Sequence, residues 1–174
     1  TASQLIPARQ AKQILEATGI KGGLIVHVGC GDGLLTAALH ANERYLVHGL
    51  DADAKNIEQA RKNIQSLGLY GKVSVIKWSG TRLPYADNLV NLLVASGPLA
   101  VSMDEVMRVL VPHGAAYIRQ QDKWTKVIKQ WPEMTDEWTH WLHDASGNAV
   151  ARDRVVGPPR RLQWTAEPLW SRHH

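Results

Sequence analysis

The fold is decided by the stretch Gly23-Leu24-Ile25-Val26-His27-Val28-Gly29-Cys30-Gly31-Asp32-Gly33. Apart from His27, its first six residues are apolar or glycine, which is typical of a strand buried on both faces. Glycines then stand at alternate positions, and the residues beyond them have helix-forming composition. Glycine lets the backbone approach a ligand closely, and the free N–H groups at a helix start point towards it. The stretch therefore predicts a nucleoside- or phosphate-binding turn.

The residues that follow narrow the choice of nucleotide. A dinucleotide fingerprint requires a glycine three positions after Gly31, but that position is Leu34. A second apolar strand ends in Asp51, 18 residues after Gly33. At about that distance this arrangement places a carboxylate on a ribose. A strand–helix–strand unit without any ligand is the alternative for this segment taken alone.

The glycine turn with Asp51 resembles motif I and the acidic second-strand end of the class I S-adenosylmethionine (SAM) methyltransferases. Two further signatures support the resemblance, which covers about 115 residues: Leu83-Pro84-Tyr85-Ala86-Asp87-Asn88 and Glu105-Val106-Met107-Arg108-Val109-Leu110-Val111-Pro112-His113-Gly114. The resemblance implies a SAM-dependent methyltransferase with an unknown methyl acceptor. It implies cofactor-binding roles for residues of three turns: His27, Gly29, Cys30, Gly31, Asp32, Gly33, Asp51, Ala52, Ser79 and Gly80. No catalytic residue is identified.

Three positions depart from the family pattern. His27 stands where members usually carry the acid that opens motif I, and Ser79 stands where an Asp often contacts the adenine. Asn91 replaces the Asp usual at the start of the fourth strand. His27 has an alternative interpretation as a core histidine with satisfied hydrogen bonds. The alternative to an enzyme is therefore a non-catalytic binding or scaffold domain with a degenerate SAM site.

Strand and helix patterns alternate through residue 118. Helices are expected over 4–18, 34–41, 54–67 and 103–110, and strands over 23–28, 45–50, 73–78, 89–95 and 115–118. This alternation predicts an α/β fold, a Rossmann-like doubly wound and mostly parallel sheet with its ligand-binding loops on one edge. Asp53 is expected to cap one helix, and Ser102 with Glu105 to form a capping box. Pro112 to Gly114 predicts a turn into the fifth strand.

The end of the chain differs in composition. There is no Phe, and six of the seven Trp lie in the last 51 residues, which predicts a domain over 1–121 and a Trp-rich tail over 122–174 with one possible strand at 124–128. Residues 136–164 resemble the junction before a PQQ-like (quinoprotein-type) β-propeller in large bacterial proteins. The chain is then expected to be an excerpt or a truncated relative. Trp138 and Trp141 predict a docking helix that is buried against the core, the missing propeller or a second copy.

Composition bounds the remaining partners. Net charge is +4, from 20 basic and 16 acidic residues, and the basic residues are scattered, so no nucleic acid is expected. No apolar run reaches about 18 residues, so no membrane span is expected. The lone Cys30 excludes an internal disulfide, and its place among glycines favours a packing role. His140, His143 and Asp144 lack further ligands, so no metal is expected. Use of SAM implies the cytoplasm, whereas the propeller resemblance implies export.

Overall fold

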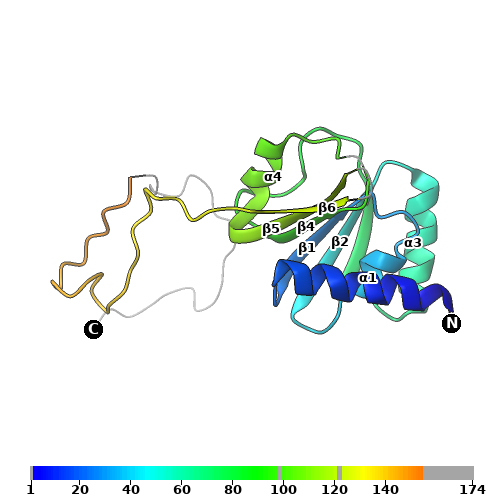
Figure 1. The fold of residues 1–174 in the computed structure, drawn as a ribbon, viewed down its shortest axis with the longest axis horizontal. Coiled ribbons are helices and arrows are strands. Elements are labelled where there is room, and N and C mark those ends of the chain that lie inside the picture. The colour runs from blue at the N-terminus through cyan, green and yellow to red at the C-terminus, as the bar shows by residue number, and fades with distance from the viewer. Residues whose placement is uncertain (1, 98, 121–122, 155–174) are drawn as a thin grey trace, which may run out of the picture. The chain divides into compact units, whose positions relative to one another are not determined.

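The computed structural model describes residues 2–97, 99–120 and 123–154 (Figure 1). The chain divides into two compact units, of which the first ends at Gln130 and the second begins at Trp131. Composition placed the boundary at residue 121. The observed division lies later in the chain, because the strand over Lys123–Ile128 belongs to the first unit.

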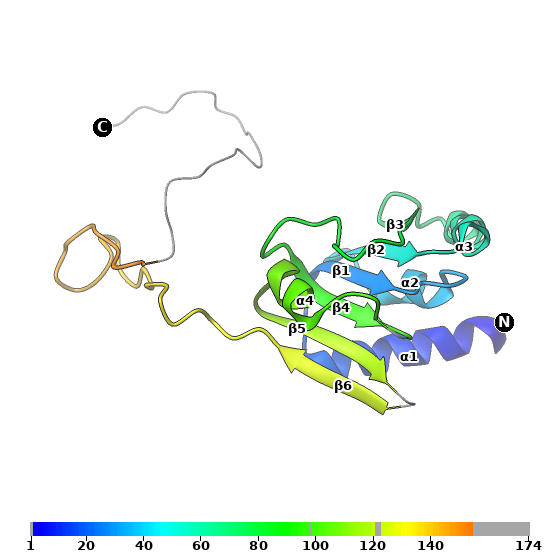
Figure 2. The same ribbon diagram turned by 90° about the horizontal axis from the view of Figure 1, so that it is seen from above.

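The first unit is built on one six-stranded sheet with the strand order β3-β2-β1-β4-β5-β6 (Figure 2). The first five strands are parallel, and β6 runs antiparallel to β5. The expected Rossmann-like, mostly parallel α/β fold is confirmed. The elements are α1 Ala2–Thr18, β1 Gly23–Val28, α2 Leu34–Leu39, β2 Tyr45–Asp51, α3 Ala54–Ser66, β3 Val73–Lys77, β4 Val90–Ala95, α4 Met103–Val109, β5 Leu110–Gln120 and β6 Lys123–Ile128.

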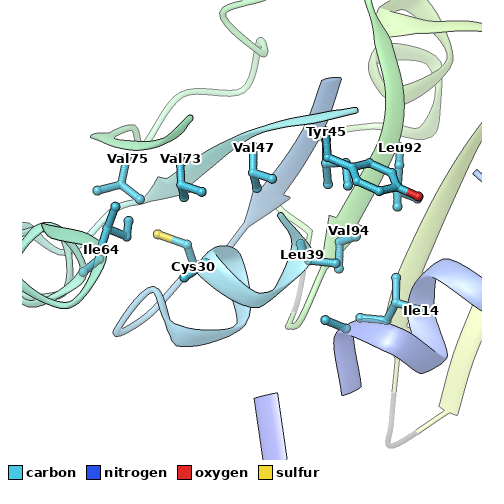
Figure 3. Close-up of a cluster of buried hydrophobic side chains, with 14 of the residues drawn as sticks. Ile14, Cys30, Leu39, Tyr45, Val47, Ile64, Val73, Val75, Leu92 and Val94 are labelled. Atoms are coloured by element: carbon cyan, nitrogen blue, oxygen red, sulfur yellow. The ribbon is translucent and has the colours of Figure 1, made fainter. Parts of the chain in front are cut away.

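Alternate residues of the central strands enter two separate core layers. Ile25 of β1 packs with residues of α1, α2 and α3 on one face of the sheet, a cluster shown in Figure 3. Its neighbour Val26 packs on the other face with α4 and the loop that contains Leu83. Both residues are fully buried. This two-sided burial explains why the strand sequences read as nearly continuous apolar runs.

Local signals for helix ends are largely confirmed. The Asp53 side chain accepts from Lys55 N–H and caps α3, and Gly68 follows that helix with a φ of 70°. Helix α2 ends at Leu39, earlier than expected, and the next residue, His40, instead bonds the carbonyl of Tyr45 at 2.6 Å. No helix in the described part of the chain is long and apolar enough to cross a bilayer.

The region around α4 departs from expectation at two points. Ser102 caps the helix by accepting from Glu105 N–H, but the Glu105 carboxylate bonds other groups, so the capping box is only half formed. Strand β5 then begins at Leu110 rather than after a turn. The turn residues are absorbed by a register shift opposite Val90, with His113 held at a φ of 64°.

The expected extra strand exists as β6 at the edge of the sheet. It pairs with β5 along its whole length, and Trp124 stacks on Tyr117 with ring centroids 4.8 Å apart. Strand and stacked pair together extend the first unit to Gln130.

The described part of the second unit, residues 131–154, contains no helix, so the docking helix expected around Trp138 and Trp141 is wrong. A buried histidine organises the segment instead. His143 Nε2 lies 2.6 Å from Asp136 Oδ2, and the backbone N–H of Arg152 donates to the same oxygen. The expected burial of the two indoles against another surface stays a prediction.

Candidate functional site

The glycine turn lies at the carboxyl edge of the sheet, where the strand order reverses. Chain order runs outward from β1 through β2 on one side and continues through β4 on the other. Open parallel sheets bind ligands in the crevice at such a switch point. The backbone N–H groups of Gly29 and Cys30 both donate to the carbonyl of Leu50, which fixes the start of the turn against β2.

The three glycines serve two purposes. Gly29, Gly31 and Gly33 all have left-handed backbones, with φ of 73°, 54° and 76°. A Cβ at Gly29 or Gly31 would meet nothing within 4 Å, so the backbone there faces open space. A Cβ at Gly33 would lie 2.7 Å from the Cβ of Ala60 in α3. The first two glycines therefore leave room for a ligand, and the third allows close packing of helices.

Asp51 joins the glycine turn to the end of β2. Its Oδ2 accepts from Gly31 N–H at 2.9 Å, and its Oδ1 accepts from Asp53 N–H at 2.9 Å and from Asn56 Nδ2 at 3.2 Å. An ionised carboxylate offers about four lone-pair sites, so capacity remains for a ligand hydroxyl. The carboxylate thus both shapes the turn and presents an acceptor at its rim. Asn56 is a member of this site that the sequence interpretation did not name.

His27 is not presented to the rim. It is 1% exposed, with Nδ1 2.8 Å from Thr36 Oγ1 and Nε2 2.7 Å from Ser96 Oγ. Burial lowers the pKa of His27 to about 4, against the opposing effect of the Asp51 charge. The imidazole is therefore neutral at pH 7, which agrees with the alternative interpretation of His27 as a satisfied core histidine.

Ala52, Ser79 and Gly80 lie on the same edge, beyond the ends of β2 and β3. All three are exposed, and Asp51 pairs with Lys77 at the end of those strands. The backbone N–H of Trp78 donates to the backbone carbonyl of Asp51 at 2.8 Å. This bond holds the turn after β3 beside the turn after β2. The structure thus brings the two turns together, as a site for a nucleoside requires.

The other two residues of the glycine turn have local roles. Cys30 is 3% exposed, and its sulfur lies in the buried cluster of Figure 3, 3.1 Å from where a Cβ on Gly49 would stand. Burial raises the pKa of its thiol to about 12, so it packs rather than reacts. Asp32 is exposed and accepts from Leu34 N–H at 3.0 Å, which supports the start of α2.

Asn91 lies away from the site. Its Oδ1 accepts from Leu24 N–H at 2.9 Å, near the amino end of β1. The side chain occupies the space that a Cβ on Gly23 would need. The change from the family's usual Asp at this position therefore affects the joining of two strands and not ligand contact.

The two remaining signatures form one network behind the site. The Arg108 guanidinium donates to the carbonyls of Leu83 at 3.2 Å and Tyr85 at 2.9 Å, and it pairs with Asp87 at 2.6 Å. Glu105 bonds the same guanidinium and accepts from Leu83 N–H at 2.7 Å. Arg108 lowers the pKa of Glu105 mainly through this hydrogen bond. Both signatures are thereby explained as the fixing of the loop before β4.

Sequence interpretation missed Ser96 and Thr36. Neither residue has a role in the sequence interpretation, yet His27 Nε2 lies 2.7 Å from the Ser96 hydroxyl and Nδ1 lies 2.8 Å from the Thr36 hydroxyl. The signal in the sequence is weak: each is a single hydroxyl residue, one directly after an apolar strand and one inside an apolar helix. Only the packing of α2 and β4 against β1 brings them to the same imidazole.

Comparison with known proteins bears on this edge of the sheet. The family model for the methyltransferase domain matches residues 25–114, which span the glycine turn and both later signatures. The ribosomal protein L11 methyltransferase of Tolumonas auensis is 26% identical over 131 residues, which are 75% of this chain and 43% of that protein. Methyltransferase GfsG of Streptomyces halstedii is 30% identical over 113 residues, 61% of this chain and 41% of that protein. The chain thus spans about two fifths of each curated relative.

Solved structures agree with these matches. A Methanococcus maripaludis protein proposed to be a SAM-dependent methyltransferase is 28% identical, with a TM-score of 0.58 over 64% of this chain and 53% of that one. A SAM-dependent methyltransferase of Aquifex aeolicus is 25% identical, with a TM-score of 0.54 over 65% of this chain and 67% of that one.

Proposed function

This chain belongs to the class I SAM-dependent methyltransferase domain family, and we propose that it binds SAM at the carboxyl edge of the sheet and transfers the methyl group to an acceptor. The observation that carries the proposal is the open left-handed backbone at Gly29 and Gly31, tied to the strand end by Asp51. This geometry fits the group: the backbone offers room for close approach, and the carboxylate offers acceptors for ribose hydroxyls.

In the proposed reaction the protein mainly positions and shields the reactants. SAM supplies a methyl group bound to a positively charged sulfonium sulfur. When the methyl group is transferred, this sulfur becomes a neutral thioether. Gly29 and Gly31 would admit the methionine and ribose portions, and Asp51 would hold the ribose hydroxyls. The turns with Ala52, Ser79 and Gly80 would line the adenine. Holding two reactants in line and excluding water contributes much of the rate in such displacements.

Asp51→Asn tests the binding site, because the amide keeps the shape of the side chain and loses its charge. SAM and its demethylated product are titrated calorimetrically into the wild type and the variant. We expect at least tenfold weaker binding to the variant, the effect of losing a charge-assisted hydrogen bond. Glu43→Gln is the matched control, since it removes one carboxylate before β2, at the opposite edge of the sheet. Equal affinities of Asp51→Asn and the wild type would refute the ribose assignment.

The same titration decides the alternative function. A non-catalytic scaffold is favoured by one observation, that His27 uses both ring nitrogens inside the protein and so offers no substitute for the missing acid. If the wild type binds neither SAM nor its product at millimolar concentration, the enzyme proposal fails and the scaffold alternative stands.

We also propose that the chain is the methyltransferase domain of a larger protein with a PQQ-like β-propeller. The support is the resemblance of residues 136–164 to the junction before such a propeller, together with the separation of a unit that begins at Trp131. An antibody raised against residues 1–130 tests this on extracts of the source cells. A polypeptide several times longer than 174 residues is expected. A single band at the mass of this chain would contradict the proposal.

A further inference from the structure

His27 links two hydroxyl side chains that come from different elements. Thr36 lies in α2 and is fully buried, and Ser96 directly follows β4 and is half-buried. The imidazole stands between them, 2.8 Å from the Thr36 hydroxyl through Nδ1 and 2.7 Å from the Ser96 hydroxyl through Nε2. A neutral imidazole donates from one nitrogen and accepts at the other, so the two hydroxyls cannot have the same role.

The surroundings of Thr36 decide which nitrogen carries the proton. A helical threonine hydroxyl often donates to the carbonyl four residues earlier. Here its one hydrogen-bond partner among the described residues is Nδ1 of His27. If Nδ1 carried the proton, the hydroxyl hydrogen of the buried Thr36 would have no acceptor, which is costly. Thr36 therefore donates to Nδ1, and the ring proton resides on Nε2.

This tautomer orients Ser96. Nε2–H donates to Ser96 Oγ, so the hydroxyl hydrogen of Ser96 must point away from the imidazole. Ala95 pairs with Val28 across β4 and β1, and the backbone N–H of Ser96 donates to the carbonyl of Val28 at 3.4 Å, so Ser96 lies beside the peptide that leads into Gly29. Ser96 thus presents a hydrogen-bond donor beside the open part of the glycine turn.

We propose that His27 is a positioning residue that holds Ser96 as a hydrogen-bond donor to the carboxylate of the methionine portion of SAM. This inference rests on the proposed function, in which the methionine portion passes Gly29. That portion carries one ammonium, which only donates, and one carboxylate, which only accepts. Of these two groups, only the carboxylate can accept the hydroxyl hydrogen of Ser96.

The first test measures the tautomer directly. Long-range ¹H–¹⁵N correlation spectra at pH 7 distinguish a protonated from an unprotonated ring nitrogen in each histidine. The His27 signals are identified as those that move in Ser96→Ala. We expect a protonated Nε2 and an unprotonated Nδ1. A proton on Nδ1, or an averaged signal from both tautomers, would overturn the inference.

The second test separates a ligand contact from a structural role. The demethylated product S-adenosylhomocysteine carries the carboxylate, whereas 5′-methylthioadenosine lacks the whole amino-acid portion. We expect Ser96→Ala to weaken binding of the first compound about tenfold and to leave the second within about twofold. Ser96→Thr keeps the hydroxyl and is expected to restore the affinity.

Variants of Thr36 test the action through His27. Thr36→Val removes the hydroxyl that fixes the tautomer. We expect it to weaken the binding of S-adenosylhomocysteine and not that of 5′-methylthioadenosine. Thr36→Ser keeps the hydroxyl and is expected to bind both compounds as the wild type does. Equal losses for both compounds in Ser96→Ala would mean a disturbed rim and would refute the contact, as would no loss for either. If neither compound binds the wild type, the proposed function and the ligand contact both fail, and the spectra decide only which tautomer His27 adopts.

Discussion

Acid should destabilise this protein through His27, and His27→Gln should remove that sensitivity. Burial lowers the pKa of His27 from 6.5 to about 4. Between those values His27 is protonated in the unfolded chain and neutral in the folded chain, so stability falls as the pH falls. The contribution is fully present above pH 6.5 and is lost progressively as the pH approaches 4.

The size follows from the two pKa values. The full shift corresponds to about 3 kcal/mol, of which about 2 kcal/mol is lost between pH 7 and pH 5. The shifted carboxyls add little in that interval, because hydrogen bonds lower the pKa values of Glu43, Glu105, Asp136 and Asp144. Burial also lowers the pKa of His48. This shift is the same in the wild type and in His27→Gln, so its effect on stability cancels in the comparison.

Urea unfolding at pH 7, 6 and 5, followed by circular dichroism, measures the effect. The variant is expected to be less stable at pH 7, because two hydrogen bonds are lost, but its stability should fall by about 2 kcal/mol less on going to pH 5. Thr36→Ser keeps the imidazole buried and should run parallel to the wild type. Parallel curves for His27→Gln and the wild type would show that His27 titrates normally, and the reasoning from burial would be refuted.

Three further outcomes are expected. Gly33→Ala should lower the free energy of unfolding by about 2–3 kcal/mol because its Cβ would meet Ala60, whereas Gly31→Ala should cost only the left-handed backbone, about 1 kcal/mol; equal urea midpoints would contradict the packing role. Arg108→Met should cost about 2–3 kcal/mol and expose the loop before β4 to proteolysis, and an unchanged digestion rate would count against the network. His143→Ala should reduce the chemical-shift dispersion of the amide signals of residues 135–154 in ¹H–¹⁵N NMR spectra. An unchanged spectrum would show that contacts other than His143–Asp136 hold the segment.

Apolar periodicity together with turn and helix-capping residues was enough to predict most of the fold. Alternating apolar runs identified the five parallel strands, and short-range signals such as the Asp53 cap depend only on neighbours in the chain. The errors arose where distant partners compete. Glu105 bonds Leu83 instead of closing its capping box, and the helix expected around Trp138 gives way to a loop held by Asp136 and His143.

The candidate site was predictable to a similar degree. Glycine spacing and Asp51 can be recognised because they act through the backbone over a fixed distance in the chain. The role of His27 could not be assigned, since its partners lie 9 and 69 residues away and each contributes one hydroxyl without a pattern. Only the pairing of β1 with β4 and the docking of α2 define that contact.

Strand β6 has a bearing on how this protein behaves when it is concentrated. A strand at the border of a sheet exposes unpaired amide and carbonyl groups that invite another chain to continue the ladder. Lys123 and Lys126 lie exposed on this strand, and Lys126 also donates to the carbonyl of Ala17 at the end of α1. A like strand approaching in register would have to desolvate these ammonium groups beside one another. The two lysines therefore oppose edge-to-edge association of β6 with a second copy of the chain. Lys126 also places its positive charge at the carboxyl end of α1, where the helix dipole is negative.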